Sequence, residues 1–125
     1  MNAAFVFLWM VFFHIIDDFI LQPICLSSLK QKSYWQENAP DKLYKYDYVC
    51  ALITHSISWT FMIMLPIAYV LGFTINPTFV IIFIFNTILH AIIDDQKANQ
   101  KSINLWHDQL CHMIQIALTF VLFFA

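Results

Sequence analysis

The sequence predicts an all-α integral membrane protein, a four-helix bundle whose helices run up, down, up and down. Three observations lead to this prediction. Hydrophobic residues make up 61% of the 125 residues and charged residues only 11%, against about 45–50% and 25% in soluble domains. Four stretches reach the ~20 mostly apolar residues that a spanning helix requires. The last two connections between these stretches are so short that consecutive helices must be antiparallel.

Composition also excludes several classes of protein. With six Lys, no Arg and a net charge of −2, the chain has no basic surface for nucleic acid. A single Gly argues against a glycine-rich nucleotide-binding loop. The three cysteines, Cys25, Cys50 and Cys111, form no Cys-x-x-Cys pair, so we expect free thiols.

The first expected helix, 3–22, begins without basic residues and carries His14, Asp17 and Asp18 in its second half. We therefore expect a retained helix rather than a cleaved signal peptide. The second, 47–71, contains Pro66, which neighbouring helices accommodate in a membrane.

Gly72 and the Asn76-Pro77 pair predict a tight turn before the third helix, 77–96. A short polar turn then leads to the fourth helix, 103–125. Residues 1–125 thus form one transmembrane domain.

The only long polar stretch is 23–46, which contains four of the six Lys and several Tyr and Trp. Because Tyr and Trp prefer the headgroup level, we expect an interfacial loop along the membrane surface. A substrate-gating role for this loop is the alternative.

The lysines predict the orientation. All six lie in or beside the loop between the first two helices and the loop between the last two. The positive-inside rule places both loops in the cytoplasm and both termini outside. We therefore expect a multi-pass protein of the inner (cytoplasmic) membrane.

Ionisable side chains cost at least ~2.5–3.5 kcal/mol each at mid-membrane, yet all five His lie within these helices. Three helices each carry a His and an Asp four residues apart, which places the pair on one helix face. With one His from the second helix, the candidate metal ligands are His14, Asp18, His55, His90, Asp94, Asp108 and His112.

Helix position predicts that these side chains converge. At 1.5 Å per residue, four His, one per helix, lie about 10–14 Å below the cytoplasmic boundary, with the three Asp one turn nearer to it. Imidazole and carboxylate are ligands of Zn²⁺, Mn²⁺ and Fe²⁺. We expect one or two such ions, with Asp18, Asp94 and Asp108 as the catalytic candidates.

Other polar residues have less defined expected roles. At ~100° per residue, Asp95 is rotated ~140° from His90, and Asp17 lies ~60° from His14 on the side away from Asp18. His107 and Cys111 also point off the shared faces. Residues expected to hydrogen-bond the ligands are Gln22, Ser58, Asn86 and Gln115.

The motifs resemble those of a family of small, uncharacterised bacterial and phage four-helix membrane proteins. This resemblance covers nearly the whole chain. The chain also resembles, more loosely, membrane-bound metal-dependent hydrolases. The matching residues are His14, Asp18, Phe19 and Gln22; His55; His90, Asp94 and Lys97; and Asp108, Gln109 and His112.

Two classes of function follow. The first is a metal-dependent hydrolase acting on a lipid-linked or phosphoester substrate at the cytoplasmic face, with an Asp that is not a ligand as general base. The alternative is a non-enzymatic membrane protein: a divalent-cation or proton carrier, or a metal-stabilised membrane effector. A purely structural role is a further option, and two facing His could ligate a haem in place of a metal ion. The nearly apolar outer helix halves favour a pocket over a channel. The sequence leaves the oligomeric state open, a homo-oligomer included.

The expected orientation is tested by cysteine labelling. In a background without the three native cysteines, Asn2→Cys should react with an impermeant thiol reagent in intact cells, whereas Ser102→Cys should react only after lysis. Labelling of Ser102→Cys alone would reverse the orientation.

Overall fold

A computed structural model describes all 125 residues, and it is 82% helical without a single strand. The expected helical fold with four long apolar helices is confirmed. Each of these four segments is long and apolar enough to cross a membrane. They are Ala3–Leu21, Lys42–Val70, Pro77–Gln100 and Leu105–Phe124.

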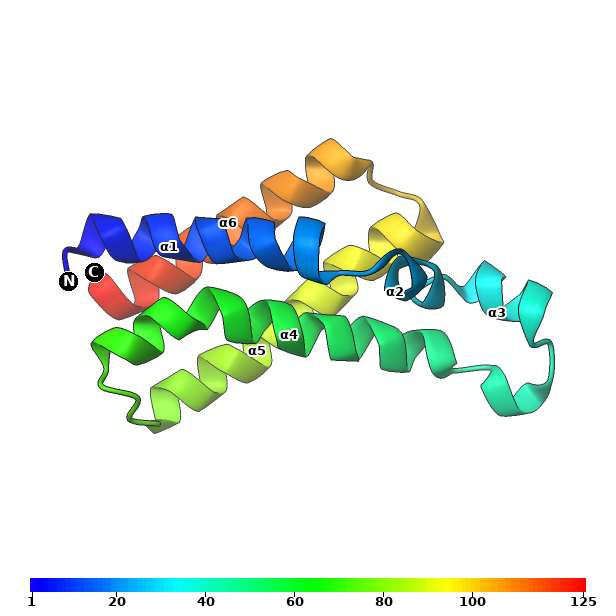
Figure 1. Ribbon diagram of the computed structural model, residues 1–125, viewed down its shortest axis with the longest axis horizontal. Coiled ribbons are helices and arrows are strands. Elements are labelled where there is room, and N and C mark those ends of the chain that lie inside the picture. The colour runs from blue at the N-terminus through cyan, green and yellow to red at the C-terminus, as the bar shows by residue number, and fades with distance from the viewer.

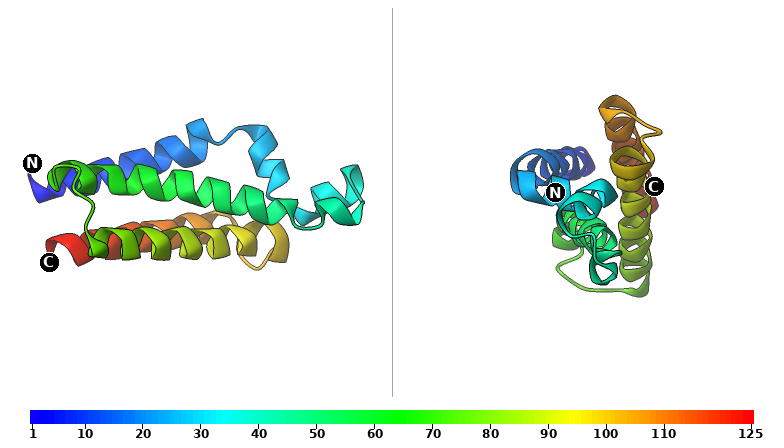
Figure 2. Two further views of the ribbon diagram at one scale, coloured as in Figure 1. Left: turned by 90° about the horizontal axis from the view of Figure 1, so that it is seen from below. Right: turned by 90° about the vertical axis from the view of Figure 1, so that its right-hand side faces the viewer.

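The long helices run in alternating directions, so that both termini lie at the same end of the bundle (Figure 1). Helix α4 packs against both α1 and α5, and α6 also packs against these two helices (Figure 2). The long helices are α1 (Ala3–Ile16), α4 (Asp47–Val70), α5 (Pro77–Asp95) and α6 (Leu105–Phe124).

Three asparagines begin three of these helices. The side chains of Asn2, Asn76 and Asn104 accept hydrogen bonds from backbone N–H groups of the first turns of α1, α5 and α6. Such caps satisfy donors that have no partner inside the helix. Between α4 and α5, Gly72 takes the left-handed conformation (φ +62°) that a tight turn requires.

Helices α1 and α5 both end in a π-helical turn, η1 (Asp17–Leu21) and η3 (Gln96–Gln100). In η1, the N–H of Gln22 donates to the carbonyl of Asp17 at 3.0 Å. Single π-helical turns are rare and are frequent at functional sites. Both lie at the lysine-bearing end of the bundle (Figure 1).

The segment 23–46 differs from a plain surface loop. It contains α2 (Ile24–Leu29), α3 (Lys32–Asn38) and a 3₁₀ turn, η2 (Lys42–Tyr44). The side chain of Asn99 holds the corner between α2 and α3. It donates to the carbonyl of Lys30 at 3.0 Å and accepts from the N–H of Lys32 at 2.7 Å. Lys30 is thereby brought into the interior, where it is only 4% exposed.

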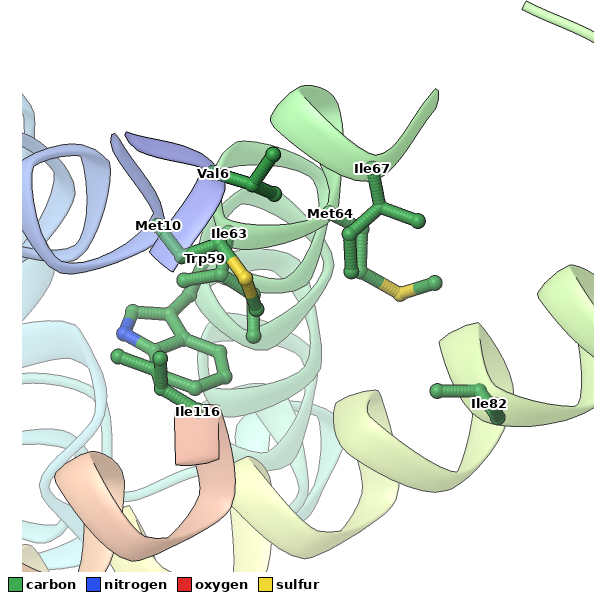
Figure 3. Close-up of a cluster of buried hydrophobic side chains, with 8 residues drawn as sticks. All are labelled: Val6, Met10, Trp59, Ile63, Met64, Ile67, Ile82 and Ile116. Atoms are coloured by element: carbon green, nitrogen blue, oxygen red, sulfur yellow. The ribbon is translucent and has the colours of Figure 1, made fainter. Parts of the chain in front are cut away.

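The interior of the bundle has a polar half and a mostly apolar half, which contains the buried polar side chains of Asn86, Gln115 and Thr119. The apolar core takes side chains from all four long helices (Figure 3). Trp59 adjoins the polar half, because its ring stacks on His90. The core side chains are Val6, Met10, Trp59, Ile63, Met64, Ile67, Ile82 and Ile116. Large apolar side chains such as Phe5, Phe12, Ile81 and Leu118 instead cover the outside of the bundle.

Candidate metal centre

The buried ionisable side chains gather in the polar half, on α1, η1, α4, α5 and α6. Two overlapping groups are suited to hold a metal ion, because their ligand atoms lie within 4.8 Å of one another. One group is Asp18, His55 and His90, and the other is His90, Asp94 and His112. The i,i+4 pair of α5, His90 and Asp94, lies at this point together with His112 of α6 and His55 of α4, whereas Asp108, also expected as a ligand, belongs to neither group.

The imidazoles of His90 and His112 are fully buried, and none of their four ring nitrogens has a hydrogen-bond partner in the protein. Trp59 stacks on His90 at 4.2 Å between ring centroids, and His90 stacks on His112 at 4.3 Å. Burying unpaired polar atoms is costly. These rings are therefore held in place by packing, with the unpaired Nε2 atom of each ring facing a carboxylate.

Asp94 lies at the centre of the ligand atoms. Its Oδ1 is 3.6 Å from His90 Nε2 and 3.4 Å from His112 Nε2, while its Oδ2 is 3.5 Å from His55 Nε2. Hydrogen bonds are shorter, at about 2.7–3.2 Å. Ligand atoms that surround one ion tetrahedrally at 2.0–2.2 Å are about 3.3–3.6 Å from each other. The spacing therefore fits a metal better than direct hydrogen bonding.

Two further carboxylate oxygens border this centre. Asp18 Oδ1 lies 3.4 Å from His55 Nε2, and Asp108 Oδ1 lies 3.4 Å from His112 Nε2. Both oxygens are buried and have no hydrogen-bond partner. The site thus offers more donor atoms than one tetrahedral ion uses.

His14, expected as a ligand, lies beside the two groups rather than in them. The indole N–H of Trp59 donates to His14 Nδ1 at 2.7 Å, so the ring proton is on Nε2, which lies 3.1 Å from Gln109 Oε1. The Gln109 amide in turn donates to Asp18 and Asp108, at 3.2 Å each. With both nitrogens paired, His14 orients Gln109 and, through it, two carboxylates.

Asp17, whose role the sequence left open, is 1% exposed and faces α4. It accepts a hydrogen bond from Ser58 at 2.6 Å, and its other oxygen lies 3.6 Å from His55 Nδ1. At 3.6 Å the contact with His55 is longer than a hydrogen bond, so Asp17 acts on the ring through its charge. Held by Ser58, Asp17 lies behind His55 and outside both metal-binding groups.

Two lysines also reach the centre. Lys30 Nζ donates to Asp94 Oδ2 at 2.6 Å and to Gln22 Oε1 at 2.8 Å. Lys97 Nζ donates to Asp108 Oδ2 at 2.7 Å. With neutral imidazoles, these two ammonium groups balance only half of the charge of the carboxylates gathered here, which are Asp17, Asp18, Asp94 and Asp108. One divalent cation would neutralise the rest.

A cavity of about 170 Å³ lies over the acidic side of the centre. On the opposite side, Trp59, Met10 and Ile116 belong to the apolar core and close the site (Figure 3). The polar side chains that line the cavity include Asp18, Gln22, Lys30, His55, Asp94 and Lys97.

Other expected partners do not contact the ligands. Asn86 and Gln115 hydrogen-bond each other, and Asn86 also bonds Thr119, which joins α5 to α6. Asp95 accepts from Asn99 at 2.7 Å.

His107 is exposed and bonds Asn104, and Cys111 is a free thiol that belongs to neither metal-binding group. Sequence reasoning missed Trp59 and Lys30. No sequence signal distinguished Lys30, because Lys32 and Lys97 also lie between two Gln.

Comparisons of the chain with protein-family models, with curated proteins and with solved structures found no match. The chemistry of the site follows from its own donor atoms.

Asp17→Asn tests the positioning of His55. Because the amide interacts less strongly with the imidazole, metal affinity should fall about 10–100-fold, as for other partners of metal ligands. Asp95→Asn, the matched control on α5, should leave the affinity near wild type. Both are measured by competition with a chromogenic chelator. Equal losses in the two variants would contradict the assignment.

Proposed function

We propose that the protein is a multi-pass membrane protein that holds a divalent transition-metal ion near the cytoplasmic face and hydrolyses a lipid or phosphoester-type substrate. Four helices of sufficient length and apolar character support insertion. So does the distribution of side chains, with large apolar groups outside and paired polar groups inside. The lysines at one end of the bundle support cytoplasmic loops and external termini.

The observation that carries the metal proposal is the set of unpaired ring nitrogens of His90 and His112 around Asp94. Nitrogen and oxygen donors suit Zn²⁺, Mn²⁺ or Fe²⁺. The charge balance favours a single ion in the group of His90, Asp94 and His112. A second ion at Asp18 and His55 would have to share His90 with the first.

A metal in this position favours hydrolysis, because such an ion activates water near neutral pH and polarises a phosphoryl or acyl oxygen. Asp18 lines the cavity and has a free Oδ1, so it is the residue placed to accept the proton of the attacking water. Gln109 holds its other oxygen. Lys30 and Lys97 provide positive charge at the cavity wall.

The alternative of an ion carrier has less support. A carrier needs polar groups along the whole membrane path. Here the interior beyond Trp59 is mostly apolar, with Met10, Ile63 and Ile116 packed there. Its buried polar side chains, Asn86, Gln115 and Thr119, carry no charge and hydrogen-bond one another. A site with access from one side fits an enzyme or a metal-stabilised effector better.

Metal content tests the first half of the proposal. Protein purified in detergent without chelator should carry about one transition-metal ion per chain by elemental analysis. His90→Ala and Asp94→Asn should each lose at least about nine-tenths of the metal, because removing a ligand costs more than the 10–100-fold of an outer partner. Asp95→Asn should retain it. A folded wild-type protein without metal would exclude the hydrolase.

The role of Asp18 is tested with metal-loaded protein and chromogenic phosphate and carboxylate esters. Asp18→Asn should keep its metal and lose activity about 10²–10⁴-fold, as expected for removal of a general base. Metal loss in this variant would make Asp18 a ligand instead. Wild-type protein that holds metal but hydrolyses none of the esters would favour the metal-stabilised effector.

A further inference from the structure

A second cavity, of about 380 Å³, lies directly outside the first. The two cavities share Gln22, Lys30 and Lys97 in their walls, and the outer one adds Ser27, Gln31 and Lys101. No acidic side chain lines the outer cavity. The inner cavity, whose wall contains two carboxylates and two lysines, is therefore next to an outer cavity whose only charged side chains are lysines and which suits an anion.

The lysines of this basic chamber keep hydrogen-bond donors for a ligand. An ammonium group has three N–H donors. Lys30 uses two of them, on Asp94 and Gln22, and Lys97 uses one, on Asp108. Lys101 forms no ion pair at all. Fixed ammonium groups with donors to spare are typical of phosphate sites.

The backbone at Lys101 gives an independent indication. Lys101 follows η3 in the left-handed conformation, at φ +54°. Gly is the usual residue at such a position, since a side chain there is strained. Strained residues occur preferentially at functional sites. Here the strained residue is the one that adds a third positive charge to the chamber.

The wall of the inner cavity also includes two apolar side chains, Phe19 and Leu105, from η1 and α6. They are 58% and 57% exposed. Phe19 and Leu105 thus extend the wall of the inner cavity onto the exposed apolar surface of the bundle. An anionic group bound between the lysines would thus have room for an apolar chain attached to it.

We propose that the lysine-lined chamber binds the phosphate group of the substrate, and that this substrate is a phosphomonoester of a lipid alcohol. The assignment rests on the proposed function and names its substrate class. Hydrolysis consumes one water molecule: its oxygen forms a new bond to phosphorus, the P–O bond to the lipid alcohol breaks, and a proton passes to the leaving oxygen. The products are the alcohol and inorganic phosphate.

Equilibrium dialysis with radiolabelled inorganic phosphate tests the chamber in metal-loaded, detergent-solubilised protein. Lys101→Gln should lower phosphate affinity about tenfold, the effect of one lost charge-assisted hydrogen bond. Lys45→Gln removes an exposed lysine that lines neither of these two cavities, and this variant should bind phosphate like wild type. Both variants should keep their metal, because neither residue contacts the metal centre.

Metal content, measured on the same samples, separates the two proposals. Absent metal overturns the metal centre itself. Full metal content without saturable phosphate binding, or with equal binding by Lys101→Gln and wild type, overturns the phosphate chamber alone.

Competition in lipid nanodiscs identifies the source of the phosphate. Protein reconstituted in nanodiscs of phosphatidylcholine with ~10% phosphatidic acid should lose bound labelled phosphate, because the lipid phosphate takes its place. Protein in nanodiscs of phosphatidylcholine alone should retain the labelled phosphate. Glycerol 3-phosphate should compete no better than free phosphate. Stronger competition by glycerol 3-phosphate than by phosphatidic acid would overturn the lipid assignment in favour of a soluble phosphoester.

Discussion

The polar half of the bundle depends on a single carboxylate, that of Asp94. Its Oδ1 faces His90 of its own helix and His112 of α6, and its Oδ2 faces His55 of α4 and Lys30 at the end of α2. Four parts of the chain thus meet at two oxygen atoms. Burying such a charge is favourable only when it is compensated by nearby partners. The packing of α4, α5 and α6 and the inward course of α2 are therefore coupled to the same electrostatic requirement.

A similar coupling extends to residues that never contact the ligands. Asp95 bonds Asn99, and Asn99 bonds the backbone on both sides of the corner that carries Lys30. On the opposite side, Trp59 supports His14, and His14 supports Gln109. The consecutive acids of α5 thus have different roles. Asp94 faces the ligand atoms, whereas Asp95 accepts a hydrogen bond from Asn99 that the amide oxygen of an asparagine would accept equally well.

Sequence periodicity was sufficient to place the long helices and the paired residues of α5 and α6, because both depend on local helix geometry. It was not sufficient for His14, because i,i+4 spacing specifies a helix face but not the neighbour on that face. Here that neighbour is Trp59, whose indole N–H occupies the ring nitrogen. Lys30 lies in a segment without hydrophobic periodicity, and its burial depends on Asn99, 69 residues away. Asp17 pointed away from the shared face of α1, yet α4 lies on that side and buries it.

The apolar half around Trp59 has an electrical consequence in the proposed membrane setting. A charged, solvent-accessible chamber that reached across the bilayer would conduct protons and dissipate the ion gradient. Because the charged side chains end at the level of Trp59 and the buried polar side chains beyond it are neutral, most of the transmembrane voltage falls across the mostly apolar half. Moving one elementary charge across the full potential costs ~2.3 kcal/mol per 100 mV. An ion that enters the centre from the cytoplasm crosses only a small part of this potential. Binding of the ion therefore depends little on the membrane potential.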